Sequence, residues 1–243
     1  MMERPAPATP AGGGAETDAE LSRRAQLLAT EHWSLLATRS LSWNEAFSRT
    51  SMFLSTLSAA TVALALASTA MKSGSAFTLF ALIVLSVTLF LGVATYVRLL
   101  QVNNEDLYWV TGMNMLRGEY TRIVPGIEQS FVAGHTLDVP GIARTFGAFD
   151  VTSNPSPLHM LITTPAIVGV ISSAIAGVIV GLVTIQLGFD HVLSLVIGIA
   201  AFLAAIALSL AYGRRQSRDY ISRAIEQRIP SARGVDGDAS TSS

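Results

Sequence analysis

The sequence predicts an all-α, polytopic membrane protein with four transmembrane helices in two antiparallel hairpins and cytoplasmic helical extensions. Its composition is the first reason, because half of the 243 residues are hydrophobic and only 14% are charged. A soluble domain carries roughly a quarter charged residues. The placement of the charges is the second reason, since four long stretches contain no Asp, Glu, Lys or Arg: 51–71, 73–97, 151–189 and 191–213.

The uncharged stretches have the length that a membrane span requires. A helix rises about 1.5 Å per residue and the hydrocarbon core is about 30 Å thick, so about 20 apolar residues cross it. We therefore expect transmembrane helices at about 52–71, 76–98, 160–187 and 191–213. Only a few residues separate the first span from the second, and the third from the fourth. The spans thus predict two hairpins, 51–98 and 159–213.

The two ends of the chain differ from the spans. Residues 1–17 and 230–243 are rich in small and polar residues that cannot bury a core, so we expect disordered tails. Residues 18–50 predict an amphipathic cytoplasmic helix, because apolar side chains recur three and four residues apart. One face carries Leu21, Ala25, Leu28, His32 and Leu35, and a neighbouring face carries Trp33, Leu36, Trp43 and Phe47.

Region 99–158 predicts a cytoplasmic extension of the second span, followed by a loop. Apolar residues at helical spacing form a packing seam that continues to Pro125-Gly126, where the helix should end. The seam consists of Leu99, Val102, Asp106, Trp109, Met113, Leu116, Tyr120 and Ile123. Short helical turns are expected around 127–132 and 140–146. After the fourth span, residues 214–229 predict a further cytoplasmic helix.

Small residues lie four apart in the third span, at Gly169, Ser173, Gly177 and Gly181. In a helix this spacing forms one face nearly free of side chains, which lets a neighbouring backbone approach closely in lipid. We interpret the face as a helix-packing surface, with the first span, itself rich in small residues, as the expected partner. The bulkier second span is expected to face lipid. The alternative is that Ser and Thr of the small-residue spans line a pore.

The basic residues predict the orientation. Of the 16 Lys and Arg residues, Lys72 alone lies between the first and second spans, and none lies between the third and fourth. The other 15 lie in the N-terminal segment, in region 98–158 or after Tyr212. Because cytoplasmic flanks hold the excess of Lys and Arg, we expect both termini in the cytoplasm. Anchors at the inner interface are expected at Trp43, Tyr96, Arg98, Tyr212, Arg214 and Arg215.

Residues that carry chemistry are sparse. The sequence has no cysteine, no phosphate-binding loop, no HExxH zinc motif and no GxSxG nucleophile motif. Its four spans contain no Asp, Glu, Lys or Arg, which argues against a proton- or ion-coupled carrier. We therefore predict no catalytic residue, no cofactor and no metal site. The basic residues are explained by topology, so nucleic acid is not an expected partner.

Asp106 is the one charge on the seam. With Glu105 and two asparagines beside it, Asp106 could form an ion-binding cluster just inside the membrane. A buried carboxylate needs a partner, however, so we favour a salt bridge to Arg98 or to a basic residue of another cytoplasmic helix. Glu45 and Arg49, four residues apart, are expected to form an exposed pair on one helix.

Two stretches of the chain carry a resemblance: EHWSLLATRSLSWNEAFSRTSMFLSTLSAA at 31–60 and YVRLLQVNNEDLYWVTGMNMLRGEY at 96–120. They resemble a group of bacterial four-span integral membrane proteins to which no activity is assigned. The likeness covers most of the chain outside its tails. It implies a location in the bacterial plasma membrane, and it carries over no functional residue.

These observations together predict a non-enzymatic, multi-pass membrane protein. It would be a helix-packing scaffold or a regulatory protein that self-associates or binds a cytoplasmic protein. Its expected partners are the lipid bilayer, further copies of the chain and that cytoplasmic protein. The alternative is an oligomeric, uncoupled ion channel or pore lined by Ser, Thr and Gly of the first and third spans. An enzyme at the inner interface that uses Asp106 and Glu105 is a third hypothesis.

Overall fold

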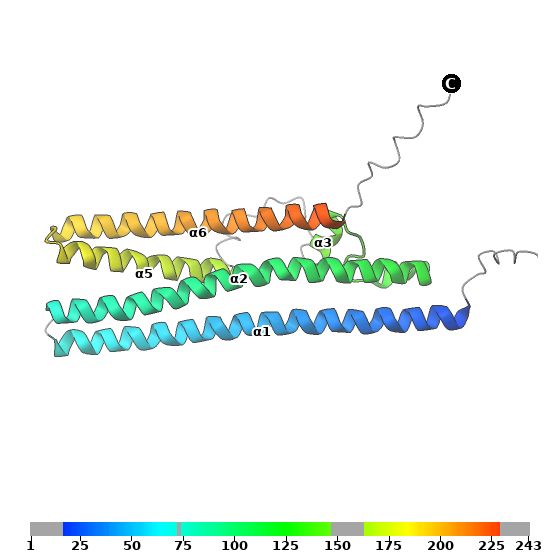
Figure 1. The fold of residues 1–243 in the computed structure, drawn as a ribbon, viewed down its shortest axis with the longest axis horizontal. Coiled ribbons are helices and arrows are strands. Elements are labelled where there is room, and N and C mark those ends of the chain that lie inside the picture. The colour runs from blue at the N-terminus through cyan, green and yellow to red at the C-terminus, as the bar shows by residue number, and fades with distance from the viewer. Residues whose placement is uncertain (1–16, 72–73, 147–162, 229–243) are drawn as a thin grey trace, which may run out of the picture. The chain divides into compact units, whose positions relative to one another are not determined.

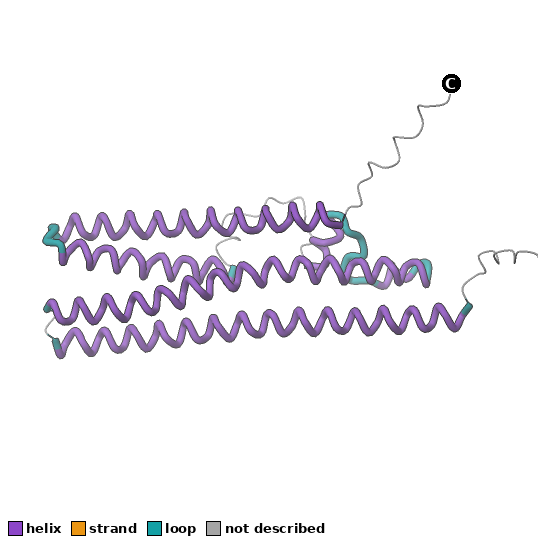
Figure 2. The backbone as a smooth tube through the Cα atoms, viewed as in Figure 1, coloured by secondary structure: helices purple, strands orange, loops and turns teal. Residues whose placement is uncertain are grey.

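The computed structural model of the chain describes residues 17–71, 74–146 and 163–228, and every regular element in these ranges is a helix (Figures 1 and 2). The long helices are α1 (Asp18–Ala70), α2 (Ser75–Ile123), α5 (Thr164–Gln186) and α6 (His191–Arg228), and the short ones are η1 (Ile127–Ser130) and α3 (Val139–Thr145). Four of them are long and apolar enough to cross a membrane, which confirms the predicted fold class. The expected terminal tails and the start of the third span, before Thr163, lie outside the described residues.

The long helix α1 is continuous from the amphipathic segment into the first span. It begins with a capping box, in which the Thr17 backbone N–H donates to Glu20 Oε2 (3.1 Å) and the Glu20 N–H donates to Thr17 Oγ1 (3.4 Å). The next helix, α2, is also continuous and extends well beyond the predicted end of the second span. It ends at Ile123, just before Pro125 and Gly126, whose φ of 91° lies in the left-handed region.

The hairpin of α5 and α6 has clear start and turn signals. Pro165 occupies the first turn of α5, where its missing N–H leaves no helical hydrogen bond unmade. Gly188 makes the turn with a φ of 87°, a conformation that favours glycine. The Asp190 carboxylate then accepts a hydrogen bond from the Val192 N–H (3.0 Å) at the start of α6. The two helices pack against each other in antiparallel fashion (Figure 1).

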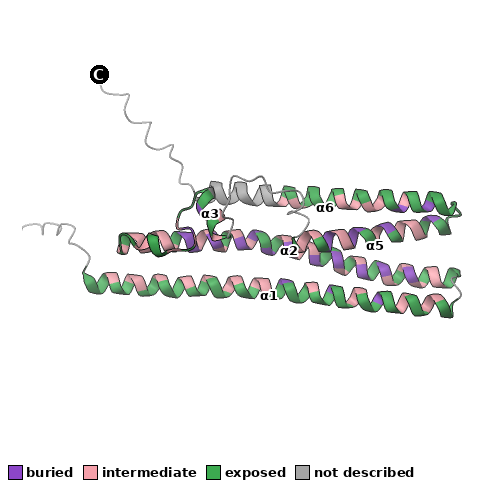
Figure 3. Ribbon diagram, turned by 180° about the vertical axis from the view of Figure 1, so that it is seen from behind, coloured by how far each residue is buried: buried purple, intermediate pink, exposed green. Residues whose placement is uncertain are grey.

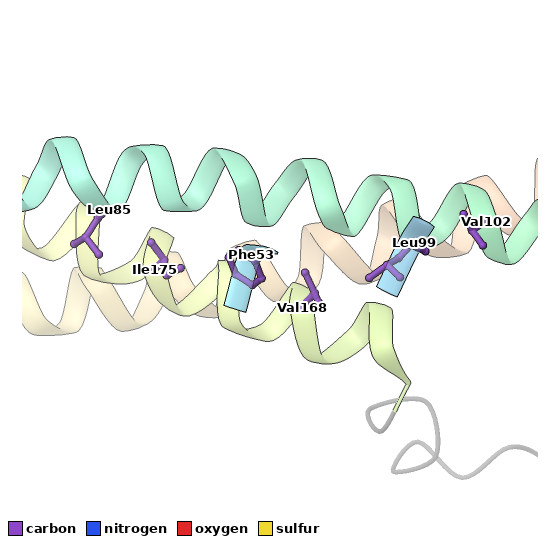
Figure 4. Close-up of a cluster of buried hydrophobic side chains, with 7 residues drawn as sticks. Phe53, Leu85, Leu99, Val102, Val168 and Ile175 are labelled. Atoms are coloured by element: carbon purple, nitrogen blue, oxygen red, sulfur yellow. The ribbon is translucent and has the colours of Figure 1, made fainter. Parts of the chain in front are cut away.

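The described chain divides into two compact units. We call residues 17–37 and 110–146 the extramembrane unit, because they hold none of the four apolar stretches, and residues 38–109 and 163–228 the membrane unit. The membrane unit contains all four apolar stretches. Its core brings together side chains from α1, α2 and α5, as Figure 4 shows, and consists of Ala46, Phe53, Leu85, Leu99, Val102, Val168 and Ile175.

The first two spans each bury one face and expose another, and they are buried to the same extent. The second span, expected to face lipid, buries a face of α2 that includes Ala81, Leu85, Thr88 and Thr95. Most small residues of the first span, which were expected to pack, lie on exposed positions of α1 (Figure 3).

Candidate functional site

The predicted charge on the seam, Asp106, is held by an arginine of α1. Its side chain is only 4% exposed, and Arg39 donates to it through two nitrogens: Nε to Oδ1 (2.5 Å) and Nη2 to Oδ2 (2.9 Å). This bidentate geometry is the strongest form of an arginine–carboxylate pair. Of the two expected partners, Arg98 or a basic residue of another helix, the structure has the second, because Arg39 belongs to α1. Arg98 is not the partner because other carboxylates lie closer to it.

Arg98 joins two carboxylates near the end of the second span. Its Nη2 donates to Glu45 Oε2 (2.7 Å) and its Nη1 donates to Glu105 Oε1 (3.0 Å). Glu45 also accepts from Arg49 Nε (2.8 Å), the pair predicted from their spacing. The two arginines hold the pKa of the Glu45 carboxyl below its usual value, with the Arg98 hydrogen bond as the main cause. Glu45 therefore stays ionised and links α1 to α2.

These ion pairs leave none of the three carboxylates, Asp106, Glu105 and Glu45, without a cationic partner. Each faces an arginine, so its negative charge is neutralised locally. Among the described residues, no group of three His, Cys, Asp or Glu side chains could hold a metal ion. The arrangement is that of a cross-link between two helices where they leave the apolar region, and it fixes how α1 and α2 align there.

The small-residue stripe of α5 contacts two different helices. A Cβ built on Gly177 would lie 2.8 Å from the carbonyl oxygen of Gly198 and 2.9 Å from Phe202 Cβ, both in α6. Gly181 also faces α6, but a Cβ there would meet the nearest atom only at 3.6 Å. The partner at these positions is thus α6 rather than the expected first span. Glycine in both helices allows this backbone approach.

The other end of the stripe packs against α2. A Cβ on Gly169 would lie 3.1 Å from the ring of Tyr96. The Tyr96 hydroxyl donates to the carbonyl oxygen of Ser209 in α6 (2.7 Å). The buried hydroxyl of Ser173 donates to the Gly169 carbonyl oxygen (2.8 Å), one turn earlier in the same helix. Tyr96, which was expected as an interface anchor, therefore lies half-buried between helices and ties α2 to both α5 and α6.

The remaining anchors differ in their surroundings. Trp43 packs beside Phe47 with ring centroids 5.5 Å apart. Tyr212, Arg214 and Arg215 are exposed on α6, as side chains at a membrane surface would be.

The extramembrane unit contains a buried polar network that sequence reasoning missed. Asn114 of α2 is fully buried, and its Nδ2 donates to the Thr136 carbonyl oxygen (3.0 Å). Its Oδ1 accepts from Arg117 Nη1 (3.0 Å) and from Thr145 Oγ1 (2.7 Å). One amide thus satisfies three groups and holds segment 131–146 against α2. Its only sequence signal is a polar residue next to the seam residue Met113.

Two glycines let segment 131–146 close on itself. A Cβ on Gly134 would collide with the backbone carbonyl of Gly141, so the two backbones are in direct contact. Asp138 caps α3 by accepting from the Gly141 N–H (3.2 Å), and it also accepts a hydrogen bond from the Thr136 hydroxyl. That hydrogen bond is the main cause that lowers the pKa of the Asp138 carboxyl. An Asp two residues before a proline is the signal that could have placed the start of α3.

The seam residues of the extramembrane unit pack against α1. Met113 is buried, and Leu116 and Tyr120 are half-buried. The ring of Tyr120 stacks on His32 with centroids 6.3 Å apart. Burial lowers the pKa of His32, and the nearby Arg117 lowers it further. Neutral imidazole is therefore the favoured form of His32 in the folded unit.

Another seam residue, Trp109, belongs to the membrane unit. Its ring packs edge-on against Tyr108 with centroids 5.1 Å apart. Its Nε1 is buried and has no hydrogen-bond partner among the described residues.

Comparison with protein-family models, with curated proteins and with solved structures found no match to this chain. The resemblance to bacterial four-span membrane proteins therefore stays a prediction from the sequence. Any functional conclusion has to come from the geometry of the chain itself.

Proposed function

We propose that the chain is a non-enzymatic, multi-pass protein of a bacterial plasma membrane that self-associates through its cytoplasmic extramembrane unit. Both termini would lie in the cytoplasm, as the basic residues predict. One observation carries the proposal: the extramembrane unit exposes many large apolar side chains, although no apolar stretch long enough to span lies in it. They are Leu27, Trp33, Leu36, Met115, Val124, Val132, Leu137 and Phe146.

Exposed apolar side chains are expected where a helix faces lipid, but in a unit outside the membrane they need another explanation. Single exposed apolar residues are common on soluble surfaces, but many of them in a small unit indicate a surface that another protein covers. Trp33 is 71% exposed and Val132 is 86% exposed. A second copy of the chain supplies the same apolar surface, and a two-fold axis would pair the surfaces without a further component.

The test is the oligomeric state of the full-length protein in lipid nanodiscs, measured by mass photometry over a range of concentrations. We expect a dimer or larger assembly for the native chain. Trp33→Glu should shift it toward the monomer. Gln26→Glu is the matched control, because it adds the same charge at an exposed polar position of α1 and should change nothing. A native chain that is monomeric at every concentration would overturn self-association.

A second candidate, an oligomeric pore, is favoured by the exposed hydroxyl side chains of α1. Ser55, Ser58 and Thr61 lie within the first span and are exposed in the single chain. Ser172 and Ser173 of α5 are buried, so a lumen would be lined by α1 rather than by both spans.

Planar-bilayer recording on the purified protein tests the pore. Unitary currents that Ser58→Leu alters would support it, with Val87→Leu on an exposed face of α2 as the control. A silent native protein at varied voltage and pH would exclude it.

A further inference from the structure

Two arginines of α6, Arg214 and Arg215, have no ion-pair partner among the described residues. Both are exposed, and no salt bridge joins either guanidinium group to a carboxylate that the structure describes. The arginines of α1 and α2 in the membrane unit differ, since each of them faces a carboxylate: Arg39, Arg49 and Arg98. The positive charges on α6 are therefore available to a partner outside the described chain.

The helix α6 is fixed against α2 in the turn before these arginines. The Tyr96 hydroxyl donates to the Ser209 carbonyl oxygen (2.7 Å), and a Cβ built on Gly213 would lie 3.2 Å from the same hydroxyl. Gly213 therefore faces α2. Its neighbours Arg214 and Arg215 lie about 100° and 200° further round the helix and are exposed. Both arginines thus extend from a part of α6 whose position against α2 is set by direct contact.

The length of the fourth span places these arginines at the level of the lipid headgroups. Asp190 directly precedes α6, and the next Asp, Glu, Lys or Arg in the sequence is Arg214, 24 residues later. A helix covers about 36 Å over that distance. This exceeds the hydrocarbon core of about 30 Å and is less than the whole bilayer of about 40–45 Å. Because a charge in the core is costly, Asp190 and Arg214 lie in the interfacial layers of opposite membrane faces, where the lipid phosphates are.

We propose that Arg214 and Arg215 bind the headgroup of an anionic phospholipid, in the leaflet opposite the turn between α5 and α6. A guanidinium group donates paired hydrogen bonds to phosphate oxygens. A zwitterionic lipid offers the same phosphate, but next to a cation that the two arginines repel. The surrounding sequence agrees with an anionic partner, since residues 212–219 contain three Arg and one Asp. The proposal rests on the membrane location within the proposed function, and it does not depend on self-association.

The test compares two lipids that have the same acyl chains and differ in headgroup charge. Native mass spectrometry of the full chain in detergent would be run with equal amounts of dioleoyl phosphatidylglycerol, which is anionic, and dioleoyl phosphatidylcholine, which is zwitterionic. Each arginine near an anionic lipid surface contributes a factor of about five in binding, so the native protein should retain phosphatidylglycerol about five- to 25-fold more. Arg214→Gln and Arg215→Gln should each lower this ratio, and the double variant should bring it close to one.

Three controls separate this site from general effects of charge. Arg23→Gln removes the same charge from an exposed arginine of α1 that also lacks a described partner, about 42 Å along the helix before Ser51, and should leave the ratio unchanged. Arg214→Lys combined with Arg215→Lys keeps both charges and should retain most of the preference. Soluble glycerophosphoglycerol, the headgroup without acyl chains, should not displace the bound lipid.

Several results would overturn the proposal. One is equal retention of the two lipids by the native protein, and another is a ratio that the double glutamine variant leaves intact. A third is an equal loss on Arg23→Gln, which would assign the preference to net charge. Displacement by the soluble headgroup would make the site one for free phosphate esters. A self-associating protein without lipid preference fails this proposal alone, whereas a monomer that keeps the preference fails only self-association.

Discussion

The close approach of α5 and α6 makes a sharp prediction about two glycines one turn apart. Alanine at Gly177 would place its Cβ 2.8 Å from a backbone oxygen of Gly198, a distance that real Cβ contacts essentially never show. The backbone of α6 cannot rotate away as a flexible side chain could, so the helices must separate. Alanine at Gly181 meets nothing closer than 3.6 Å.

These two distances predict opposite effects of alanine at Gly177 and at Gly181 on the free energy of unfolding. Overpacking a tight interior costs about 1–3 kcal/mol, and we expect Gly177→Ala to fall in this range. Gly181→Ala should be neutral or stabilise by up to about 1 kcal/mol, because alanine favours the helix more than glycine does. The same substitution four residues apart thus has two signs, and only the interhelical distance differs.

The free energy of unfolding of both variants is measured by reversible unfolding of the full chain in mixed micelles. The fraction of SDS serves as the denaturant, and far-ultraviolet circular dichroism gives the signal. Gly198→Ala should resemble Gly177→Ala, since its Cβ would lie 2.9 Å from the Gly177 carbonyl oxygen. The two changes combined should be non-additive, because the residues touch. Equal stabilities of the Gly177→Ala and Gly181→Ala proteins would refute the packing geometry.

Three more predictions concern polar contacts. Asp106→Ala should destabilise the protein by about 3 kcal/mol in the same unfolding assay. This is the low end of the range for a broken buried pair, because Arg39 is partly exposed. Replacing both residues by apolar ones should recover most of the loss. Gly134→Ala should cost about 1–3 kcal/mol by colliding with Gly141, and should speed hydrogen exchange across 131–146 while leaving the α5–α6 hairpin unchanged. His32 has a lowered pKa, so the unfolded chain binds its proton first: stability should fall as pH drops below about 6.5, and His32→Gln should flatten that part of a pH series of unfolding curves.

The long elements were predictable because their physical signal is local. The length of an apolar run and the absence of charge specify a span without any knowledge of neighbours. The end of α2 at Ile123 follows from Pro125 and Gly126 in the same way. The short helix α3 begins at Val139, within one residue of its expected start.

Partner choice was not predictable, since it depends on how helices rotate and pair. The stripe at Gly177 fits any helix that offers a bare face, and both α1 and α6 do so in the sequence. In the structure the partner is α6, where Gly198 lets its backbone approach Gly177. In the same way, Asp106 could accept from several arginines, and the alignment of α1 with α2 selects Arg39. The burial of Asn114 could not be predicted from the sequence, because an Asn side chain is usually exposed to solvent.

The most direct test of the four-span topology uses the fact that the chain contains no cysteine. Single cysteines would be placed at Ser75 and Phe189, at the hairpin ends, and at Ser22 and Gln129, in the extramembrane unit. Intact bacterial cells would then be treated with a membrane-impermeant maleimide. We predict labelling at 75 and 189 in intact cells, and labelling at 22 and 129 only after the membrane is opened. Labelling of either extramembrane position in intact cells together with a hairpin end would contradict the account.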